Sequence, residues 1–299
     1  MTRIVECVPN FSEGRRKEVV DAIADMARAV DGVRVLDVEM DATHNRAVIT
    51  FVGEPEKVKV AAFACASKAV ELIDLNKHEG EHPRVGAVDV IPFVPISEIT
   101  MSDCVQLARS LGEEISTRLN VPVYLYEAAA TRPERRNLAK VRKGQFEGLR
   151  EEIRTNPEKA PDFGPSELHP TAGAVVIGAR EPLIAYNINL GSGDLSIAKA
   201  IAKAVREKDG GLKHVKALGF ETDRENVVQV SMNLVNFRET PVHVVFDKVK
   251  SHADELGVSI VGSEVVGLIP EDALVDSAEH YLKIEDFSKS QILEYKLRE

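Results

Sequence analysis

Residues Leu75–Val90, with the sequence LNKHEGEHPRVGAVDV, lie between a periodic apolar helix and an apolar strand. The stretch concentrates two histidines, three acids, an arginine, a proline and two glycines in one short connection. Titratable side chains in a loop between two regular elements indicate chemistry, because a rigid scaffold often presents its functional groups on loops. The helix before this loop and the strand after it also set the element order on which the fold prediction rests.

The chain up to this strand predicts one βαββαβ unit. Apolar side chains recur at helical spacing in two segments and form short strand-like runs in four others. Ser12 stands before the first helix as its expected N-cap, and Asp31-Gly32 ends that helix. The expected elements are strand 4–11, helix 15–30, strands 33–38 and 46–52, helix 56–75 and strand 87–94.

A second unit with the same order follows a less regular stretch. That stretch holds helix 101–119, strand 121–126, a charged segment 131–152 that is helical in pieces, a proline-rich loop 155–173 and strand 175–177. The second unit comprises strand 182–190, helix 195–207, strands 215–220 and 226–234, helix 242–256 and strand 259–266, before helices 272–281 and 289–297. The repeated order predicts an α+β fold with two tandem ferredoxin-like subdomains, 1–178 and 179–299. A ligand channel is expected between them, lined by the proline-rich loop.

Composition excludes several classes of function. The chain has 299 residues, 44% of them hydrophobic, no tryptophan and a formal net charge of −10. An acidic chain with few aromatic residues does not favour nucleic acid or an anionic membrane as a partner, so an anionic ligand must be held by local arginines and lysines. Cys7, Cys65 and Cys104 are scattered, which predicts reduced thiols in a cytoplasmic protein. No apolar run approaches the length of a membrane span.

His78 to His82 read HEGEH, a literal H-E-x-x-H. On a helix this motif binds the zinc of a metallopeptidase, but Gly80 and Pro83 both disfavour a helix here. One alternative is a solvated turn with a structural histidine. Another is that His82 is a general acid–base, because imidazole titrates near neutral pH, with Arg84 pairing a carboxylate beside it. These residues alone leave the three interpretations open.

Several motifs occur in an order that resembles the glutamate formimidoyltransferase family, the formiminotransferase portion of the formimidoyltransferase-cyclodeaminases. The resemblance extends from Arg3 to about Tyr281 and implies a transferase without the cyclodeaminase portion. The motifs are ECVPNFSEG at 6–14, NR at 45–46 before TFVG at 50–53, GEHPR at 80–84 with GAVDV at 86–90, PVYLY at 122–126, PDFGP at 161–165 and AYNINL at 185–190.

The resemblance implies that the formimidoyl group of N-formimidoyl-L-glutamate passes to N5 of tetrahydrofolate and releases glutamate, a step of histidine degradation. It further implies two ferredoxin-like subdomains with folate between them, a homodimer, tetrahydrofolate as co-substrate and no metal. Two other interpretations stay open from the sequence: formyl transfer on the same scaffold and folate binding without catalysis.

The motif GEHPR assigns the catalytic histidine of the family to His82. Arg46 and Arg84 are expected to clamp substrate carboxylates, although Arg46 at a strand edge also suits a structural salt bridge. Glu39 is expected among the substrate-binding residues and is one candidate for the acid that orients the imidazole, at a position where the family carries aspartate. His44 and His78 are expected at the surface. Folate contacts are expected from Phe163, Gly164, Pro165, Ser166, Glu167, Leu168, His169, Pro170, Thr171 and Ala172.

The charged segment holds a basic run that could dock the anionic tail of folate. Because its basic residues alternate with acidic ones, a solvated helix face is favoured over a ligand site. The run consists of Arg132, Arg135, Arg136, Lys140, Arg142 and Lys143.

Overall fold

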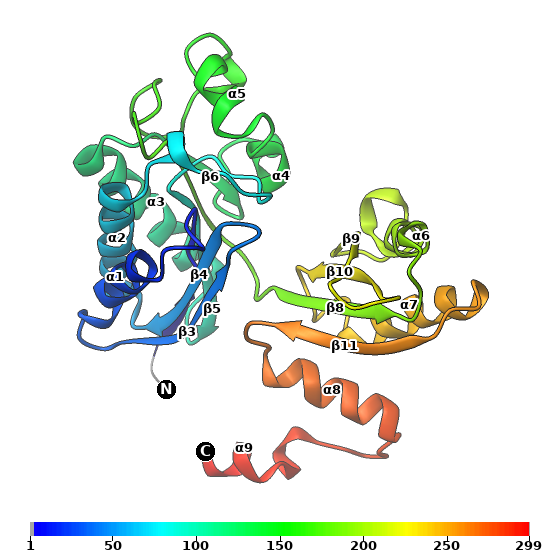
Figure 1. Ribbon diagram of the computed structural model, residues 1–299. Coiled ribbons are helices and arrows are strands. Elements are labelled where there is room, and N and C mark those ends of the chain that lie inside the picture. The colour runs from blue at the N-terminus through cyan, green and yellow to red at the C-terminus, as the bar shows by residue number, and fades with distance from the viewer. Residues whose placement is uncertain (1–2, 299) are drawn as a thin grey trace. The chain divides into compact units, whose positions relative to one another are not determined.

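The computed structural model describes residues 3–298 and separates the chain into two compact units, Met1–Glu181 and Pro182–Glu299 (Figure 1). Each unit combines helices with its own β-sheet, so the fold is mixed α and β as expected. The two units are described separately below.

The sheet of the first unit has the strand order β1-β4-β2-β5-β7-β6, with β3 paired to β4. β1 and β2 both pair with β4 and with β5, so they are two parts of one inner position interrupted around Pro9. β7 runs parallel to β5 and to β6, whereas the other pairs are antiparallel. The strands are β1 Ile4–Cys7, β2 Asn10–Phe11, β3 Val33–Asp41, β4 Arg46–Gly53, β5 Val88–Ser97, β6 Val123–Glu127 and β7 Val175–Ala179.

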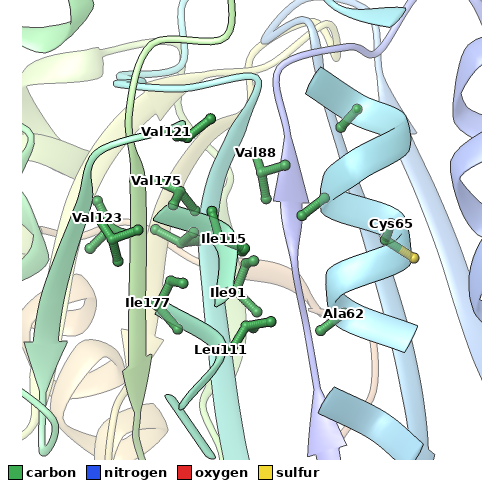
Figure 2. Close-up of a cluster of buried hydrophobic side chains, with 14 of the residues drawn as sticks. Ala62, Cys65, Val88, Ile91, Leu111, Ile115, Val121, Val123, Val175 and Ile177 are labelled. Carbon is green, nitrogen blue, oxygen red and sulfur yellow. The ribbon is translucent and has the colours of Figure 1, made fainter. Parts of the chain in front are cut away.

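Three long helices, α1 (Lys17–Arg28), α2 (Pro55–Leu72) and α3 (Met101–Leu119), pack in that order beside the sheet (Figure 1). Their buried residues share one core with the strands. Figure 2 shows part of this core, where Ala62 and Cys65 of α2 and Ile115 of α3 gather with Val88 of β5 and Val175 of β7. Burial of this apolar surface supplies the main free energy that holds the unit together.

The start of α1 differs from the sequence prediction. Ser12 does not cap the helix: it is 4% exposed, and its hydroxyl donates to the carbonyl of Gly86 at 2.7 Å. The helix begins at Lys17, and the carboxylate of Glu13 accepts the backbone N–H groups of Arg15 and Arg16, each at 2.9 Å. The sequence motif identified a polar residue before a helix but not its long-range partner.

The charged segment is helical in pieces, as predicted. It contains η2 (Pro133–Arg136), α4 (Leu138–Val141) and α5 (Gln145–Glu152), and η3 (Pro157–Lys159) lies near the start of the proline-rich loop. A further short turn, η1 (Leu75–Lys77), opens the loop after α2.

The second unit has an antiparallel sheet with the order β11-β8-β10-β9. Its elements follow one another as β8 (Ile184–Leu190), α6 (Leu195–Val205), η4 (Glu207–Asp209), β9 (Val215–Glu221), β10 (Val228–Leu234), α7 (Val242–Glu255) and β11 (Ile260–Val266). α6 and α7 contact each other and share a buried core with alternate strand residues such as Ile188 and Val230. α8 (Glu271–Leu282), η5 (Lys289–Gln291) and α9 (Leu293–Arg298) follow.

The three cysteines are free and buried. Burial raises the pKa of the Cys65 thiol to about 12, so this side chain behaves as a small apolar group at neutral pH. Within residues 3–298, the helices are all too short or too polar to cross a bilayer.

Two long loops of the first unit are hydrogen-bonded to each other. Leu75 N–H donates to Thr171 O at 2.8 Å, Ala87 N–H to Ala172 O at 2.8 Å, and Ala174 N–H to Val85 O at 3.0 Å. Gly86 lies at the closest approach, where a Cβ atom would stand only 1.7 Å from the carbonyl oxygen of Ala174. Only glycine fits at this position, because any side chain would separate the loops.

We expect Gly86→Ala to destabilise the first unit by about 3 kcal/mol, because the added methyl overpacks a backbone contact that cannot yield. Differential scanning calorimetry measures the loss as a lower transition temperature. Gly148→Ala is the matched control: Gly148 lies in α5 with nothing within 4 Å of an added Cβ, so this variant should gain about 0.5–1 kcal/mol. Equal transition temperatures for the two variants would contradict the steric argument.

Candidate active site

The H-E-x-x-H stretch is not helical, so its two histidines do not form the zinc motif. His78 is half-buried rather than at the surface: its Nε2 lies 2.9 Å from Asn45 O, and its Nδ1 accepts from Arg84 Nε at 3.2 Å. Both ring nitrogens are therefore used inside the chain, and His78 supports the loop. Across residues 3–298, no group of three histidine, cysteine or acidic side chains is arranged to hold a metal ion.

The turn between β3 and β4 holds this loop in place. Asn45 adopts a left-handed backbone with φ 49°, and its side chain accepts from Gly14 N–H and donates to Glu79 O, both at 2.9 Å. Gly80 packs so closely that a Cβ there would stand 2.4 Å from His44 O. The turn thereby fixes the backbone on which His82 stands.

His82 and Arg46 are in direct contact. Arg46 Nη1 lies 3.3 Å from His82 Nε2 and 3.3 Å from Asn10 Oδ1. A guanidinium can only donate, so in this contact His82 Nε2 carries the lone pair and accepts. Burial and the nearby Arg142 lower the pKa of Arg46 from its usual value. The predicted catalytic histidine and one predicted clamp are thus neighbours in the structure.

Arg142 joins this site through a buried carboxylate. Asp89 is 1% exposed, accepts Val85 N–H at 2.8 Å and also accepts from Arg142 Nη2. Arg142 follows α4, and its side chain is only 15% exposed. The prediction that the basic run is a solvated helix face was therefore wrong at this residue, because the segment folds back onto β5.

The same prediction was wrong at Arg135, which is 3% exposed. Its guanidinium pairs with Asp162 at 2.5 Å and lies 5.0 Å over the ring of Tyr124. The alternation of basic and acidic residues along the sequence did not reveal these long-range partners.

The position of His82 strongly disfavours its charged form. Burial lowers the pKa of His82 to about 2, and the charges of Arg142, Arg46, His44 and His78 act in the same direction. The imidazole is therefore neutral at neutral pH, which is the state required to accept a proton.

Arg84 is 8% exposed and already matched by a carboxylate of the chain. Its Nη1 and Nη2 donate to the two oxygens of Glu147 at 2.9 and 2.7 Å, and its Nε donates to His78. This bidentate contact couples the loop to α5 and lowers the pKa of Glu147. A role for Arg84 as a substrate clamp stays a prediction, and Arg46 is the stronger candidate.

Glu39 lies on β3 opposite Val48 and is half-buried. Its charge offsets part of the lowering of the Arg46 pKa, so Glu39 lies near the site on the side of the arginine. Asp41, two residues on, accepts from His44 N–H at 2.8 Å and lies 2.6 Å from His44 Nδ1. Burial alone would raise the pKa of Asp41, but these contacts with His44 lower it overall.

The predicted folate loop divides into two parts. Phe163 packs on Gly112 of α3, and its carbonyl accepts Val123 N–H at 2.9 Å, so the first part lies against α3 and β6. Leu168 is 9% exposed, and the residues after it are hydrogen-bonded to the His82 loop as described above. The structure therefore brings the end of this loop, but not its beginning, into contact with the backbone around His82.

Sequence reasoning assigned no site role to Asn10, Asn45 or Asp89, and it considered Arg142 only as one member of the basic run. Asn45 and Arg46 were noted as an adjacent pair, and the left-handed backbone of Asn45 is a conformation that asparagine tolerates better than most residues. Asp89 stands inside an apolar strand sequence, VDVI, where a buried acid requires a partner. That pattern was the available signal, although it does not name Arg142.

Comparison with known proteins gives consistent family matches over both units. Residues 4–180 match the formiminotransferase domain, N-terminal subdomain, and residues 185–296 match the formiminotransferase domain. The chain is 49% identical over 295 residues to a glutamate formimidoyltransferase of Streptococcus pyogenes serotype M1, covering 98% of each chain. It is 51% identical over 296 residues to a glutamate formimidoyltransferase of Thermoplasma acidophilum, covering 98% of this chain and 97% of that one. It also matches a formimidoyltransferase-cyclodeaminase of Gallus gallus at 46% identity, spanning 53% of that longer protein.

The buried pair of Arg135 and Asp162 anchors the segment before Phe163. We expect Asp162→Asn to cost about 3 kcal/mol in the free energy of unfolding, because it leaves a buried guanidinium without its counter-charge. Denaturant unfolding measures the change. Glu114→Gln removes an exposed ion pair with Arg118 on α3 and should change stability by no more than about 0.5 kcal/mol. Similar losses for both variants would contradict a special role for the buried pair.

Proposed function

This chain belongs to the formiminotransferase family, and we propose that it transfers the formimidoyl group of N-formimidoyl-L-glutamate to N5 of tetrahydrofolate, releasing glutamate. Two relatives with the name glutamate formimidoyltransferase support this over nearly the full length. The observation that carries the proposal is the neutral His82 in the GEHPR loop, whose Nε2 accepts from Arg46. Tetrahydrofolate is the co-substrate, and the reaction belongs to histidine degradation.

The chemistry requires one group that moves a proton. The lone pair of folate N5 attacks the formimidoyl carbon, and the π electrons of its C=N bond move to nitrogen in the tetrahedral intermediate. His82 Nε2 takes the proton that N5 loses and delivers it to the nitrogen of glutamate. The electron pair on the imino nitrogen then re-forms the C=N bond as the bond between the glutamate nitrogen and the transferred carbon breaks, and glutamate leaves as the amine. A side chain that is neutral when the substrates bind and can hold the proton transiently serves both steps.

The other predicted residues are assigned by their neighbours. Arg46 binds a carboxylate of the amino-acid substrate beside His82, and Glu39 acts on the same arginine electrostatically. Arg84, through Glu147 and His78, holds the loop in the shape that presents His82.

Folate is bound by the loop from Phe163 to Ala172. Two observations support this. The last residues of the loop are hydrogen-bonded to the His82 loop, and Gly164 has φ 87°, a backbone conformation that glycine adopts without strain. Backbone without a side chain allows close approach of a ligand.

We further propose that the two units are tandem ferredoxin-like subdomains, 1–178 and 179–299. Element order and strand order support this: β8-α6-β9-β10-α7-β11 with the sheet order β11-β8-β10-β9 has the connectivity of that motif. β3, β4, β1/β2 and β5 repeat the order in the first unit, with β7 and β6 added at one edge. The ligand channel, the homodimer and the cytoplasmic location stay predictions.

Formyl transfer from N-formyl-L-glutamate is the second candidate, because the two groups differ only in O for NH. A folate-binding protein without catalysis is the third.

The test is turnover with tetrahydrofolate and N-formimidoyl-L-glutamate, followed as 5,10-methenyl-folate after acid treatment. We expect product from the wild type and a kcat lower by about 10²–10⁴ for His82→Gln, because the proton shuttle is removed. His252→Gln is the matched control: this histidine lies on α7 of the second unit, beside Glu255, and its loss should leave kcat unchanged.

Product formed only from N-formyl-L-glutamate would replace the proposed donor. Folate binding without transfer from either donor would overturn the proposed function. Normal turnover by His82→Gln would remove His82 from the mechanism while leaving the reaction in place.

A further inference from the structure

Two guanidinium nitrogens beside His82 lack hydrogen-bond partners within the described residues. The Nε atoms of Arg46 and Arg142 are both shielded from solvent and unpaired. A buried donor without an acceptor is costly, so native chains normally satisfy such groups. Two unpaired cationic donors at one site indicate an acceptor that comes from outside the chain.

The acids near His82 do not pair with the two unpaired Nε–H groups. The basic groups that face His82 are Arg46 on β4, Arg142 after α4, His44 in the β3–β4 turn and His78 in the loop. The acids near Arg46 are Glu39 and Asp41 on β3 and Asp89 on β5. Asp41 is bonded to His44, and Asp89 to Val85 N–H and Arg142. The two Nε–H groups are not matched by these carboxylates, and the guanidiniums lower the pKa values of their neighbours.

The contact between Arg46 and His82 also restrains the base. With Arg46 Nη1 3.3 Å from His82 Nε2, the lone pair that must take a proton already accepts a hydrogen bond from a cation. The imidazole is in the correct protonation state but is a weak base while the two arginines face it. Something must draw Arg46 away before His82 can act.

The proposed substrate carries a group in the right position. In N-formimidoyl-L-glutamate the reacting nitrogen is bonded to Cα, and the α-carboxylate carbon is attached to that same atom, so nitrogen and carboxylate carbon are about 2.5 Å apart. A nitrogen within about 3 Å of His82 Nε2 therefore brings the α-carboxylate within reach of Arg46, whose Nη1 lies 3.3 Å from the same Nε2.

We propose that Arg142 and Arg46 together bind the α-carboxylate of the amino-acid substrate, and that this contact draws Arg46 off His82 Nε2 and frees the base. The inference rests on the proposed function and adds Arg142 to it as a specificity-determining residue, held for this role by Asp89. The base is thus active only when an α-amino-acid derivative occupies the site.

The direction of the effect on His82 follows from the charges. In the free chain, burial and the two arginines lower its pKa to about 2. A carboxylate between the arginines offsets their field and favours the protonated imidazole, so the pKa rises, while burial still holds it below its usual value. A higher pKa makes His82 a stronger proton acceptor at neutral pH.

The first test is the NMR titration of His82, assigned from the spectrum that His82→Gln lacks. We expect no protonation in the free wild type down to the pH at which it unfolds, and protonation of the folded chain at a higher, measurable pH with saturating N-formyl-L-glutamate, whose α-nitrogen is uncharged. 4-Formamidobutanoate, which has the γ-carboxylate and the formamido nitrogen but no α-carboxylate, should leave the free-state behaviour. No response to N-formyl-L-glutamate, or an equal response to both ligands, would overturn the proposal.

The second test is steady-state kinetics of Arg142 variants. We expect Arg142→Gln to raise KM for N-formimidoyl-L-glutamate about tenfold to a hundredfold, as for the loss of a charge-assisted hydrogen bond, with KM for tetrahydrofolate unchanged. Arg142→Lys keeps the positive charge opposite Asp89 and should fall between Arg142→Gln and the wild type. Arg28→Gln, an exposed arginine paired with Asp25 on α1, is the control for removing a positive charge.

The two failures are distinguishable. Absence of formimidoyl transfer by the wild type contradicts the proposed function. Transfer with unchanged KM for the amino-acid substrate in Arg142→Gln contradicts only the role of Arg142. The NMR titration uses the wild-type chain and so decides the inference even where an Arg142 variant folds poorly.

Discussion

A single buried carboxylate, Asp89, connects the scaffold of this protein to its chemistry. It stands one residue into β5, is 1% exposed, and accepts from Val85 N–H and from Arg142. The first contact fixes the end of the loop that carries His82, and the second brings the segment after α4 back to the sheet. A carboxylate at this depth requires such partners, because the free-energy cost of burying an unpaired charge far exceeds the gain from packing one apolar residue in the core. Asp89 therefore orders two segments that lie more than fifty residues apart in the sequence.

Further backbone and side-chain contacts hold the loop that carries His82. The His82 loop is attached to residues 171–174 by main-chain hydrogen bonds, to the β3–β4 turn by Asn45, and to α5 by the bidentate pair of Arg84 and Glu147. Gly86 and Gly80 allow approaches that a Cβ would block. Because several independent contacts hold the loop, it can hold His82 beside two arginines. That arrangement disfavours the imidazolium, and the apolar core of the unit compensates for the cost.

The sequence was informative where structure depends on local pattern. Hydrophobic periodicity predicted both βαββαβ orders, and Gly80 and Pro83 correctly argued against a zinc-binding helix. It failed where the decisive partner is distant. Ser12 has the composition of a helix cap but bonds to Gly86, and the basic run looks solvated although Arg135 and Arg142 are paired with buried acids. A charged residue gives the same local sequence pattern whether water solvates it or an aspartate fifty residues away pairs with it. The pattern alone therefore could not separate a solvated charge from a buried ion pair.

The same limit explains why the proposed catalytic histidine was easier to identify than its environment. The motif GEHPR is contiguous, so resemblance assigned His82 directly, whereas the groups that tune it come from β4, β5 and the segment after α4. A histidine in water already has a pKa suited to proton transfer. Whether His82 can act therefore depends on how its environment changes that pKa. Here the fold lowers the basicity of His82 and leaves two cationic donors unpaired. Such an arrangement is unfavourable in isolation and becomes favourable with an anionic substrate, which couples recognition of the substrate to activation of the base.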